Sequence, residues 1–327
     1  MKYTDFCSKK IKLSFGSKEG FRILCVSDIH GGVGYDKENT DKYFRSLLSK
    51  TSPDIVLLLG DIAGPGVIHI ENAQQLKEML DCLVKPLEEA EIPWAHVFGN
   101  HDDNYGLSNE EAQKVYESYP HCVSFHNKEL SESSDYIIPV YGNNGVPAFC
   151  IYAFDSHRGN DAFLQKYGLE QNTVIKLKNN GGIDDGERGL DFCQVNMYYE
   201  LSKALETEAG KKVPAMAVMH VPLKELAQCS VNKEETKFCG TFGEPVSCQC
   251  FNAGFIRACA ERGDVKAVCF GHDHENNVSA EYCGITLCND GYLSCHASHT
   301  KETLGGRIFD ISQNSPQALK TEFINAL

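Results

Sequence analysis

Side chains able to bind metal ions stand directly after apolar runs at five places in this chain. The last of these runs, 268–270, leads into Gly271 and then into His272 and His274. In extended backbone, residues two apart point to the same side, whereas a turn at a glycine lets them splay toward two neighbouring points. A His-x-His pair alone does not make a metal site, so its partners must come from elsewhere in the chain.

The other four places supply such partners, each as a short polar turn after an apolar run. These turns contribute Asp28 and His30, then Asp61, then Asn100 with His101 and Asp102, and finally His220. Each alone has an ordinary explanation, because a histidine after a strand is more often a hydrogen-bonded turn residue than a ligand. Five strand ends that nearly all carry nitrogen or oxygen ligands form a much stronger pattern than any one of them.

The first third of the chain repeats a unit of strand, polar turn and helix. We expect strands at 21–27, 54–59 and 92–98, and helices at 40–50 and 71–90. This alternation predicts a largely parallel, wound sheet. Ligands of open α/β sheets bind at the carboxyl ends of the strands, so the first three polar turns should share one rim.

The second half has a different pattern. Asn143-Asn144-Gly145 predicts a hairpin between two apolar runs. The elements expected after it are helices at 194–208 and 252–262, strands at 214–219 and 265–270, and two or three further strands up to Ile311. Two loop-rich excursions, 155–191 and 223–252, separate these elements. We expect residues 1–327 to form a single domain.

Composition and charge limit the classes of partner. A chain of 327 residues with 42% apolar and 23% charged residues is globular and can bury a large core. Its formal net charge of −14 repels polyanions, which argues against nucleic acid as a partner. No apolar run is long enough to cross a membrane, and the first residues do not form a signal-type segment. We therefore expect a cytoplasmic protein without a membrane partner.

The chain contains fifteen cysteines, nine of them between Cys229 and Cys295. One interpretation is a set of disulfides or a second metal site. The other is reduced cysteines that serve as small buried hydrophobic residues in a cytosolic protein. No CxxC pair is present, and Cys25, Cys150 and Cys269 lie inside apolar runs, which favours the second interpretation.

The polar turns, taken in order, resemble the signature of the calcineurin-like metallophosphoesterases. The motifs that carry this resemblance are Asp28-x-His30, Gly60-Asp61, Gly99-Asn100-His101-Asp102, His220 and Gly271-His272-x-His274. They span residues 21–275. Within the family, the segments 220–223 and 271–276 are similar to a branch related to the purple acid phosphatases. That branch contains the fungal dose-dependent cell-cycle regulator phosphatase and its plant relatives.

The resemblance implies an α/β fold with four layers, α/β/β/α, and a centre of two divalent metal ions. It implies that one ion is bound by Asp28, His30, Asp61 and His274. It implies that the other is bound by Asp61, Asn100, His220 and His272, with the carboxylate of Asp61 bridging the two. Mixed nitrogen and oxygen ligands suit Mn, Fe, Zn or Co, and the sequence does not choose among these.

The resemblance also assigns two catalytic residues. His101 matches the family's non-ligand histidine, which contacts the substrate phosphate or protonates the leaving oxygen, and Asp102 would orient that imidazole. Purple acid phosphatases carry a tyrosine ligand to Fe(III) three residues after the bridging aspartate, where this chain has Gly64. We therefore expect divalent metals and no tyrosinate charge-transfer colour.

The reaction implied is hydrolysis of a phosphoric ester by in-line attack of a metal-bridging hydroxide, without a covalent phospho-enzyme. Two divalent ions less the charges of Asp28 and Asp61 leave about +2, which suits a phosphomonoester of about −1.5 to −2. A phosphomonoesterase acting on a phosphorylated small molecule or phosphoprotein is thus favoured over a phosphodiesterase. A non-catalytic scaffold with the same fold is the third alternative.

Overall fold

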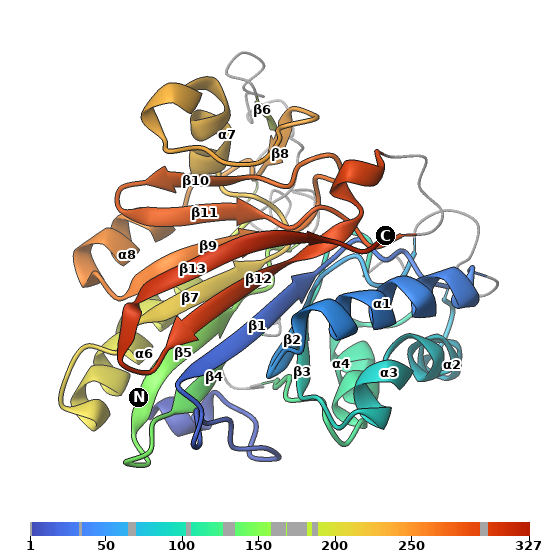
Figure 1. Ribbon diagram of the computed structural model, residues 1–327, viewed down its shortest axis with the longest axis horizontal. Helices are drawn as coiled ribbons and strands as arrows, with labels where there is room; N and C mark the ends of the chain where they lie inside the picture. Colours follow the sequence, from blue (N-terminus) through green and yellow to red (C-terminus); the bar gives the residue numbers. More distant parts are fainter. Residues whose placement is uncertain are drawn as a thin grey trace.

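The computed structural model describes residues 2–32, 35–64, 70–102, 106–126, 135–157, 168, 182–184, 189–294 and 300–327. Two β-sheets pack face to face, and helices cover the outer face of each (Figure 1). The expected four-layer α/β/β/α architecture is therefore confirmed.

The first two layers are a five-stranded sheet and the helices α1 to α4, which lie on its outer face. Its strand order is β13-β12-β1-β2-β3, and β1, β2 and β3 are parallel. The strands are β1 Gly20–Val26, β2 Ile55–Leu59, β3 Trp94–Val97, β12 Gly305–Ser312 and β13 Ser315–Asn325. The helices are α1 Lys37–Thr51, α2 Ala73–Leu83, α3 Lys85–Glu89 and α4 Asn109–Glu117.

The second pair is a six-stranded sheet with α6, α7 and α8 on its outer face. Its order is β10-β11-β9-β7-β5-β4, in which the four central strands are parallel and the two edge strands antiparallel. The strands are β4 Tyr136–Tyr141, β5 Pro147–Ala153, β7 Ala215–Met219, β9 Val265–Phe270, β10 Ser279–Tyr282 and β11 Ile285–Asn289. The helices are α6 Phe192–Ala209, α7 Lys224–Val231 and α8 Phe255–Arg262.

Burial on both faces explains why the strands are apolar without alternation. In β1, Ile23 and Cys25 point into the core between the two sheets, while Leu24 and Val26 pack under α1 and α2. Because each sheet has a core on both sides, its central strands need an apolar residue at every position. The apolar runs of the sequence therefore mark buried strands.

Two expected elements differ from the structure. The predicted helix at 71–90 is two helices, α2 and α3, which meet at Val84. Pro86 stands in the first turn of α3, where a proline fits because no hydrogen bond from its nitrogen is required. The predicted loop-rich segment 223–252 contains α7 and the strand β8, Val246–Cys248, which pairs with β6, Gly182–Asp184. Most of the other predicted excursion, 155–191, lies outside the described residues.

The predicted hairpin and the cysteine interpretation agree with the structure. β4 and β5 pair antiparallel across the Asn143–Gly145 turn. Apart from Cys248 and Cys250, the cysteines within the described ranges are free thiols, and most of them are buried. The disulfide interpretation is therefore wrong for these residues, since the thiols serve as small apolar groups.

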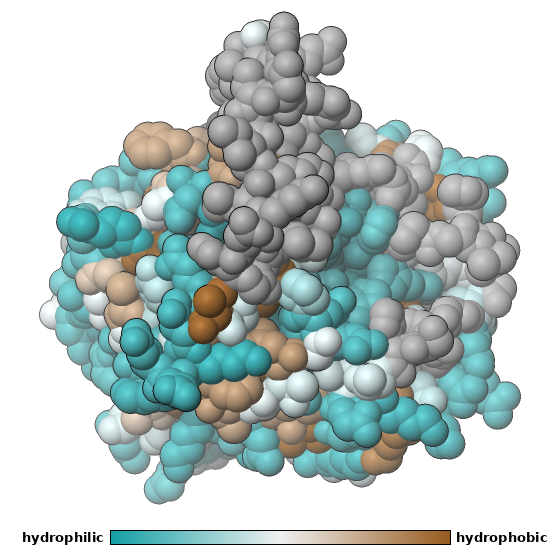
Figure 2. Space-filling model, turned by 90° about the horizontal axis from the view of Figure 1, so that it is seen from above, coloured by the Kyte–Doolittle hydropathy of each residue, from teal (hydrophilic) through white to brown (hydrophobic). Residues whose placement is uncertain are grey.

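The described surface offers little apolar area. Figure 2 shows a face on which hydrophilic residues predominate and hydrophobic residues are scattered. Among the described large hydrophobic side chains, those strongly exposed are Phe192 in α6, Val231 in α7 and Leu327 after the end of β13. No described helix is long and apolar enough to cross a membrane.

Candidate metal centre

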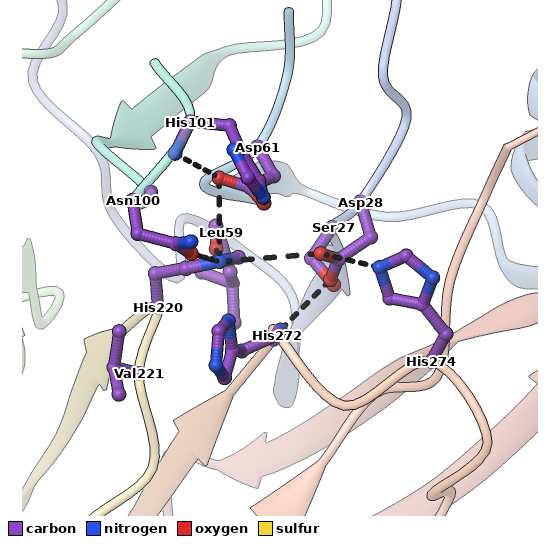
Figure 3. A network of polar contacts seen from close by, with 12 residues as sticks. Ser27, Asp28, Leu59, Asp61, Asn100, His101, His220, Val221, His272 and His274 are labelled. Carbon is purple, nitrogen blue, oxygen red and sulfur yellow. Dashed lines mark hydrogen bonds and ion pairs between the residues drawn. The ribbon is translucent and has the colours of Figure 1, made fainter. Parts of the chain in front are cut away.

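The five polar turns predicted from the sequence meet at one end of the sandwich. Three follow β1, β2 and β3 of the five-stranded sheet, and two follow β7 and β9 of the six-stranded sheet. Figure 3 shows their side chains pointing toward one another. Two groups within this cluster could each hold a metal ion, Asp28 with His30 and His274, and Asp61 with His220 and His272.

The first group surrounds one oxygen of Asp28. The Nε2 atom of His274 lies 3.1 Å from Asp28 Oδ1 and 3.2 Å from the Nε2 atom of His30. His30 Nε2 lies 3.8 Å from the same carboxylate oxygen and 4.0 Å from Asp61 Oδ2. Three ligand atoms therefore converge on one point, as a cation site requires.

The second group is built around His220. Its Nε2 atom lies 3.0 Å from Asn100 Oδ1 and 3.4 Å from Asp61 Oδ1, and the His272 ring stands 5.1 Å away between centroids. Asp61 thus presents Oδ1 to this group and Oδ2 to His30 of the first group. This placement between the groups is the one that a bridging carboxylate needs.

Backbone carbonyls fix the tautomers of two of these imidazoles. The Nδ1 atom of His30 lies 2.6 Å from Gly64 O, and the Nδ1 atom of His220 lies 2.7 Å from Leu59 O. A carbonyl oxygen only accepts, so each Nδ1 carries a proton, and in the neutral imidazole each Nε2 turns a lone pair inward. For His220 that lone pair faces the amide oxygen of Asn100. Such a contact is repulsive unless a proton or a cation lies between the atoms, so the residues fit a divalent metal ion.

The electrostatics point the same way. Burial alone would raise the pKa of Asp61, but the imidazoles of His220 and His30 lower it to about 2. His274 and His220 similarly hold the pKa of the buried Asp28 far below its ordinary value, against the effect of burial. Burial alone would lower the pKa of His220, but the Asp61 and Asp28 carboxylates raise it to about 10. The cluster therefore attracts positive charge, whether protons or metal ions.

Backbone strain is concentrated at the same residues. Asp28, His30, Asp61 and His272 have φ angles of 52°, 50°, 49° and 73°, in the left-handed region that non-glycine residues avoid. They are four of the nine described non-glycine residues with positive φ. Strain of this kind persists where the surroundings hold it and is typical of functional sites.

Hydrogen bonds between the turns hold this strained backbone. The N–H of Asp28 donates to Gly60 O at 3.1 Å, and the N–H of His30 donates to Asp61 O at 3.0 Å. Within the six-stranded sheet, the N–H of Gly271 donates to His220 O at 3.1 Å. Across the sandwich, the N–H of His272 donates to Asp28 Oδ2 at 2.9 Å. The turns are therefore one connected structure that positions the side chains.

His101 and Asp102 lie beside the cluster. The His101 N–H donates to Asp61 Oδ1 at 2.9 Å, and its ring nitrogen Nε2 lies 3.9 Å from Asp61 Oδ2. The His101 side chain is 34% exposed, against 0% for His220. Burial lowers the pKa of His101 below its ordinary value. His101 is thus placed to meet a ligand that enters from solvent.

The carboxylate of Asp102 binds the backbone of two turns. Its Oδ1 accepts from the N–H groups of Ile62 and Ala63, at 3.0 and 3.1 Å, and its Oδ2 accepts from Gly99 at 2.7 Å. These bonds join the turn after β2 to the turn after β3. The role expected from the sequence, orientation of the His101 ring, stays a prediction.

The motif reading missed three residues around the centre. Ser27 and Asp290 form a hydrogen-bonded chain to Asp28, and the ring of Tyr292 stacks on His274 with centroids 5.9 Å apart. Asp290 could have been found, because it directly follows β11 just as the other polar residues follow their strands. Ser27 and Tyr292 carry no comparable signal.

Comparison with known proteins gives a consistent result. The family described as calcineurin-like phosphoesterase matches residues 21–276. "Probable inactive purple acid phosphatase 14" of Arabidopsis thaliana is 28% identical over 313 residues, covering 87% of this chain and 73% of the plant protein. "Phosphatase DCR2" of Saccharomyces cerevisiae is 25% identical over 80% of this chain, which spans 45% of the yeast protein.

Among solved structures, a dimetal phosphatase from Danio rerio matches with a TM-score of 0.53 over 94% of this chain and 96% of that chain. At 10% identity this likeness concerns the fold alone. The family match, in contrast, covers most of the chain and includes all five turns that build the metal centre. The chain belongs to the calcineurin-like phosphoesterase family.

Proposed function

We propose that the protein is a two-metal phosphomonoesterase. The observation that carries the proposal is the position of Asp61, whose two carboxylate oxygens face two separate groups of potential ligands. In the proposal, Asp28, His30, Asp61 and His274 bind one divalent ion. Asp61, Asn100, His220 and His272 bind the other. When bound, such ions supply a nucleophile at neutral pH and positive charge for the phosphoryl group in the transition state.

The chain's own residues then have distinct tasks. The hydrogen bond from the buried imidazole of His220 to the carbonyl of Leu59 fixes the position of His220 within the second group. Asp61 holds the backbone of His101 through the bond to its N–H, so the ring of His101 stays at the rim. From there His101 contacts the phosphate and passes a proton to the leaving oxygen. Asp102 keeps the two turns that carry these residues together.

Charge favours a monoester over a diester. Two divalent ions less two carboxylates leave about +2, which a dianionic monoester neutralises better than a monoanionic diester. p-Nitrophenyl phosphate should therefore be hydrolysed faster than bis(p-nitrophenyl) phosphate by protein loaded with Mn, Zn, Fe or Co. Faster hydrolysis of the diester would contradict the monoesterase proposal and favour a phosphodiesterase that uses the same centre.

Metal content tests the centre itself. Elemental analysis should find about two ions per chain, and Asp61→Asn should lower this number sharply because one carboxylate serves both groups. Protein that no metal supplement can load or activate would refute the enzyme and leave the non-catalytic scaffold.

A second pair of variants tests His101. His101→Ala should lower kcat by about 10²- to 10⁴-fold while retaining metal, as expected for a general acid. His121→Gln is the matched control, because His121 lies beside the opposite end of β3, where its carbonyl accepts from Trp94 N–H. Equal activity of the two variants would exclude the catalytic role of His101.

The plant relatives bear names that describe them as inactive, so the activity of the present chain has to be measured. "Probable inactive" describes those proteins, and the present chain carries every ligand type of the family's motifs at the expected positions. That complete set favours an enzyme over a scaffold. The proposed substrate is a phosphorylated small molecule or phosphoprotein, and the free thiols suit a reducing compartment such as the cytoplasm.

A further inference from the structure

The hydroxyl of Ser27 lies between two buried carboxylates. Its Oγ atom is in hydrogen-bond contact with Asp28 Oδ2 and lies 2.8 Å from Asp290 Oδ1. The carbonyl oxygen of Gly291 stands farther away, at 3.4 Å. All three neighbours are acceptors, whereas a serine hydroxyl has one proton to donate. A second proton is therefore required for both short contacts to be hydrogen bonds.

The surroundings of Asp28 show where the serine proton goes. Asp28 Oδ1 faces His274, His30 and His220, so it is the oxygen turned toward the proposed metal. Asp28 Oδ2 points away and accepts from the backbone N–H of His272 at 2.9 Å. A donated proton from Ser27 would complete the support of this oxygen and fix the direction of Oδ1.

The surroundings of Asp290 show where the second proton resides. Asp290 is fully buried, and its Oδ2 atom has no hydrogen-bond partner. An ionised carboxylate in that position would be costly, whereas a neutral carboxylic acid is tolerated. The charge of the nearby Arg307 lowers the pKa of Asp290, but the guanidinium directs its hydrogen bonds to Asn289 O, Asn277 O and Thr321 Oγ1.

We propose that Asp290 is a positioning residue which, as a neutral acid, donates to Ser27 so that Ser27 donates to Asp28 and aims Asp28 Oδ1 at the metal. The proposal rests on the proposed role of Asp28 as a ligand. Asp290 touches neither substrate nor metal. Gly271 packs directly against the hydrogen-bonded side chains of Ser27 and Asp28. A Cβ at position 271 would lie 2.7 Å from Ser27 Oγ and 3.0 Å from Asp28 Oδ2.

Titration of Asp290 makes the hydrogen-bonded series Asp290–Ser27–Asp28, here called the relay, depend on pH. Burial and the charge of Asp28 raise the pKa of Asp290 to about 8, although the hydrogen bond from Ser27 lowers it. The charged and titratable groups that face Asp290 are Asp28, His220, Arg307 and the thiols of Cys25, Cys269 and Cys288. Below this pKa Asp290 holds its proton and the relay is intact. Above it the ionised Asp290 draws the Ser27 proton away from Asp28, so metal binding should weaken.

The test compares Zn²⁺ affinities, measured with a metal-buffering chelator, at about pH 7 and about pH 9.5. Asp290→Leu removes the donor and should weaken binding about 10- to 100-fold at the lower pH. Asp290→Asn keeps a donor and should restore the affinity while abolishing the alkaline weakening. Ser27→Ala should weaken binding at both pH values, and Asp290→Asn should add nothing to it.

Two outcomes would overturn the proposal. One is Asp290→Asn as damaging as Asp290→Leu at about pH 7, which would make Asp290 an anion. The other is an Asp290→Asn effect that persists in the Ser27→Ala background. Infrared spectroscopy gives a readout that does not depend on metal or turnover. The native protein should show the carbonyl band of a buried carboxylic acid near neutral pH that Asp290→Asn lacks. Absence of this band would refute the relay even if the hydrolase is real.

Discussion

At the scale of single residues, the centre depends on how closely two turns approach each other. Gly99 lies directly against Asp61, and a Cβ at position 99 would overlap both Asp61 Oδ1 and the Asp61 nitrogen. A Cβ at Gly60 would lie 2.7 Å from His220 Nδ1. The glycines of the Gly-Asp and Gly-Asn-His motifs are therefore required by space around the ligands.

We predict that Gly99→Ala weakens metal binding by at least about tenfold, because it must displace Asp61, which serves both groups. Gly99 does not have a positive φ, so the effect is a steric one. Gly20→Ala is the control, since its Cβ would meet only Ile311 O, at 3.6 Å. Elemental analysis and chelator competition measure the result, with circular dichroism to confirm the fold. Full metal content in Gly99→Ala would show that the turns adjust freely.

At the scale of elements, β3 is joined to α4 by a buried histidine. The ring of His96 stacks on Tyr116 with centroids 3.6 Å apart, and its Nδ1 atom lies 2.8 Å from Ser124 Oγ. Its Nε2 atom has no partner. Burial lowers the pKa of His96 to about 3, so the ring stays neutral in the folded protein.

This burial predicts an acid-sensitive contact. The unfolded state binds a proton at His96 below about pH 6.5, whereas the folded state does so only near pH 3, so stability falls as the pH drops through this window. His96→Phe keeps the aromatic stacking and should remove about 2–3 kcal/mol of the loss at about pH 4.5. Urea denaturation at both pH values measures this, and the value at about pH 7.5 isolates the packing effect. An unchanged acid loss in His96→Phe would contradict the prediction.

At the scale of the whole molecule, the candidate centre joins the two sheets. Asp28, Asp61 and Asn100 come from the five-stranded sheet, whereas His220, His272 and His274 come from the six-stranded sheet. Bound ions would therefore cross-link the two halves of the sandwich at one end. The core between the sheets holds the rest of the interface.

We predict that removal of metal by a chelator lowers the Tm. An ion present at 100 times its Kd stabilises the folded state by about 2.7 kcal/mol, and adding it back should restore the Tm. Metal affinity should also fall as the pH drops, because protons compete for His220, whose pKa its neighbouring carboxylates raise to about 10 against the effect of burial. Calorimetry of native and Asp61→Asn protein, each with and without chelator, separates the stabilisation due to bound metal from other effects of the chelator. A Tm that chelation leaves unchanged would show that the centre does not couple the sheets.

The sequence by itself determined most of the central strands and placed the candidate ligands directly after them. Apolar runs such as 54–59 and 265–270 are strands because both faces of each sheet are buried, and the polar residues after them gather at one end. Motif spacing also determined the family, which the match to residues 21–276 confirms. The same local reasoning could not find the break at Val84 between α2 and α3, because periodicity continues across it.

Only the tertiary structure shows how the candidate ligands lie relative to one another. The position of Asp61 between two groups depends on the packing of β2 and β3 against β7, which are far apart in sequence. The relay from Asp290 through Ser27 to Asp28 joins positions separated by 263 and 1 residues. A serine next to an aspartate is a common sequence, so nothing in the sequence marks Ser27 as special. Its role arises because the sandwich places a second buried carboxylate beside it, where too few protons are available for the acceptors present.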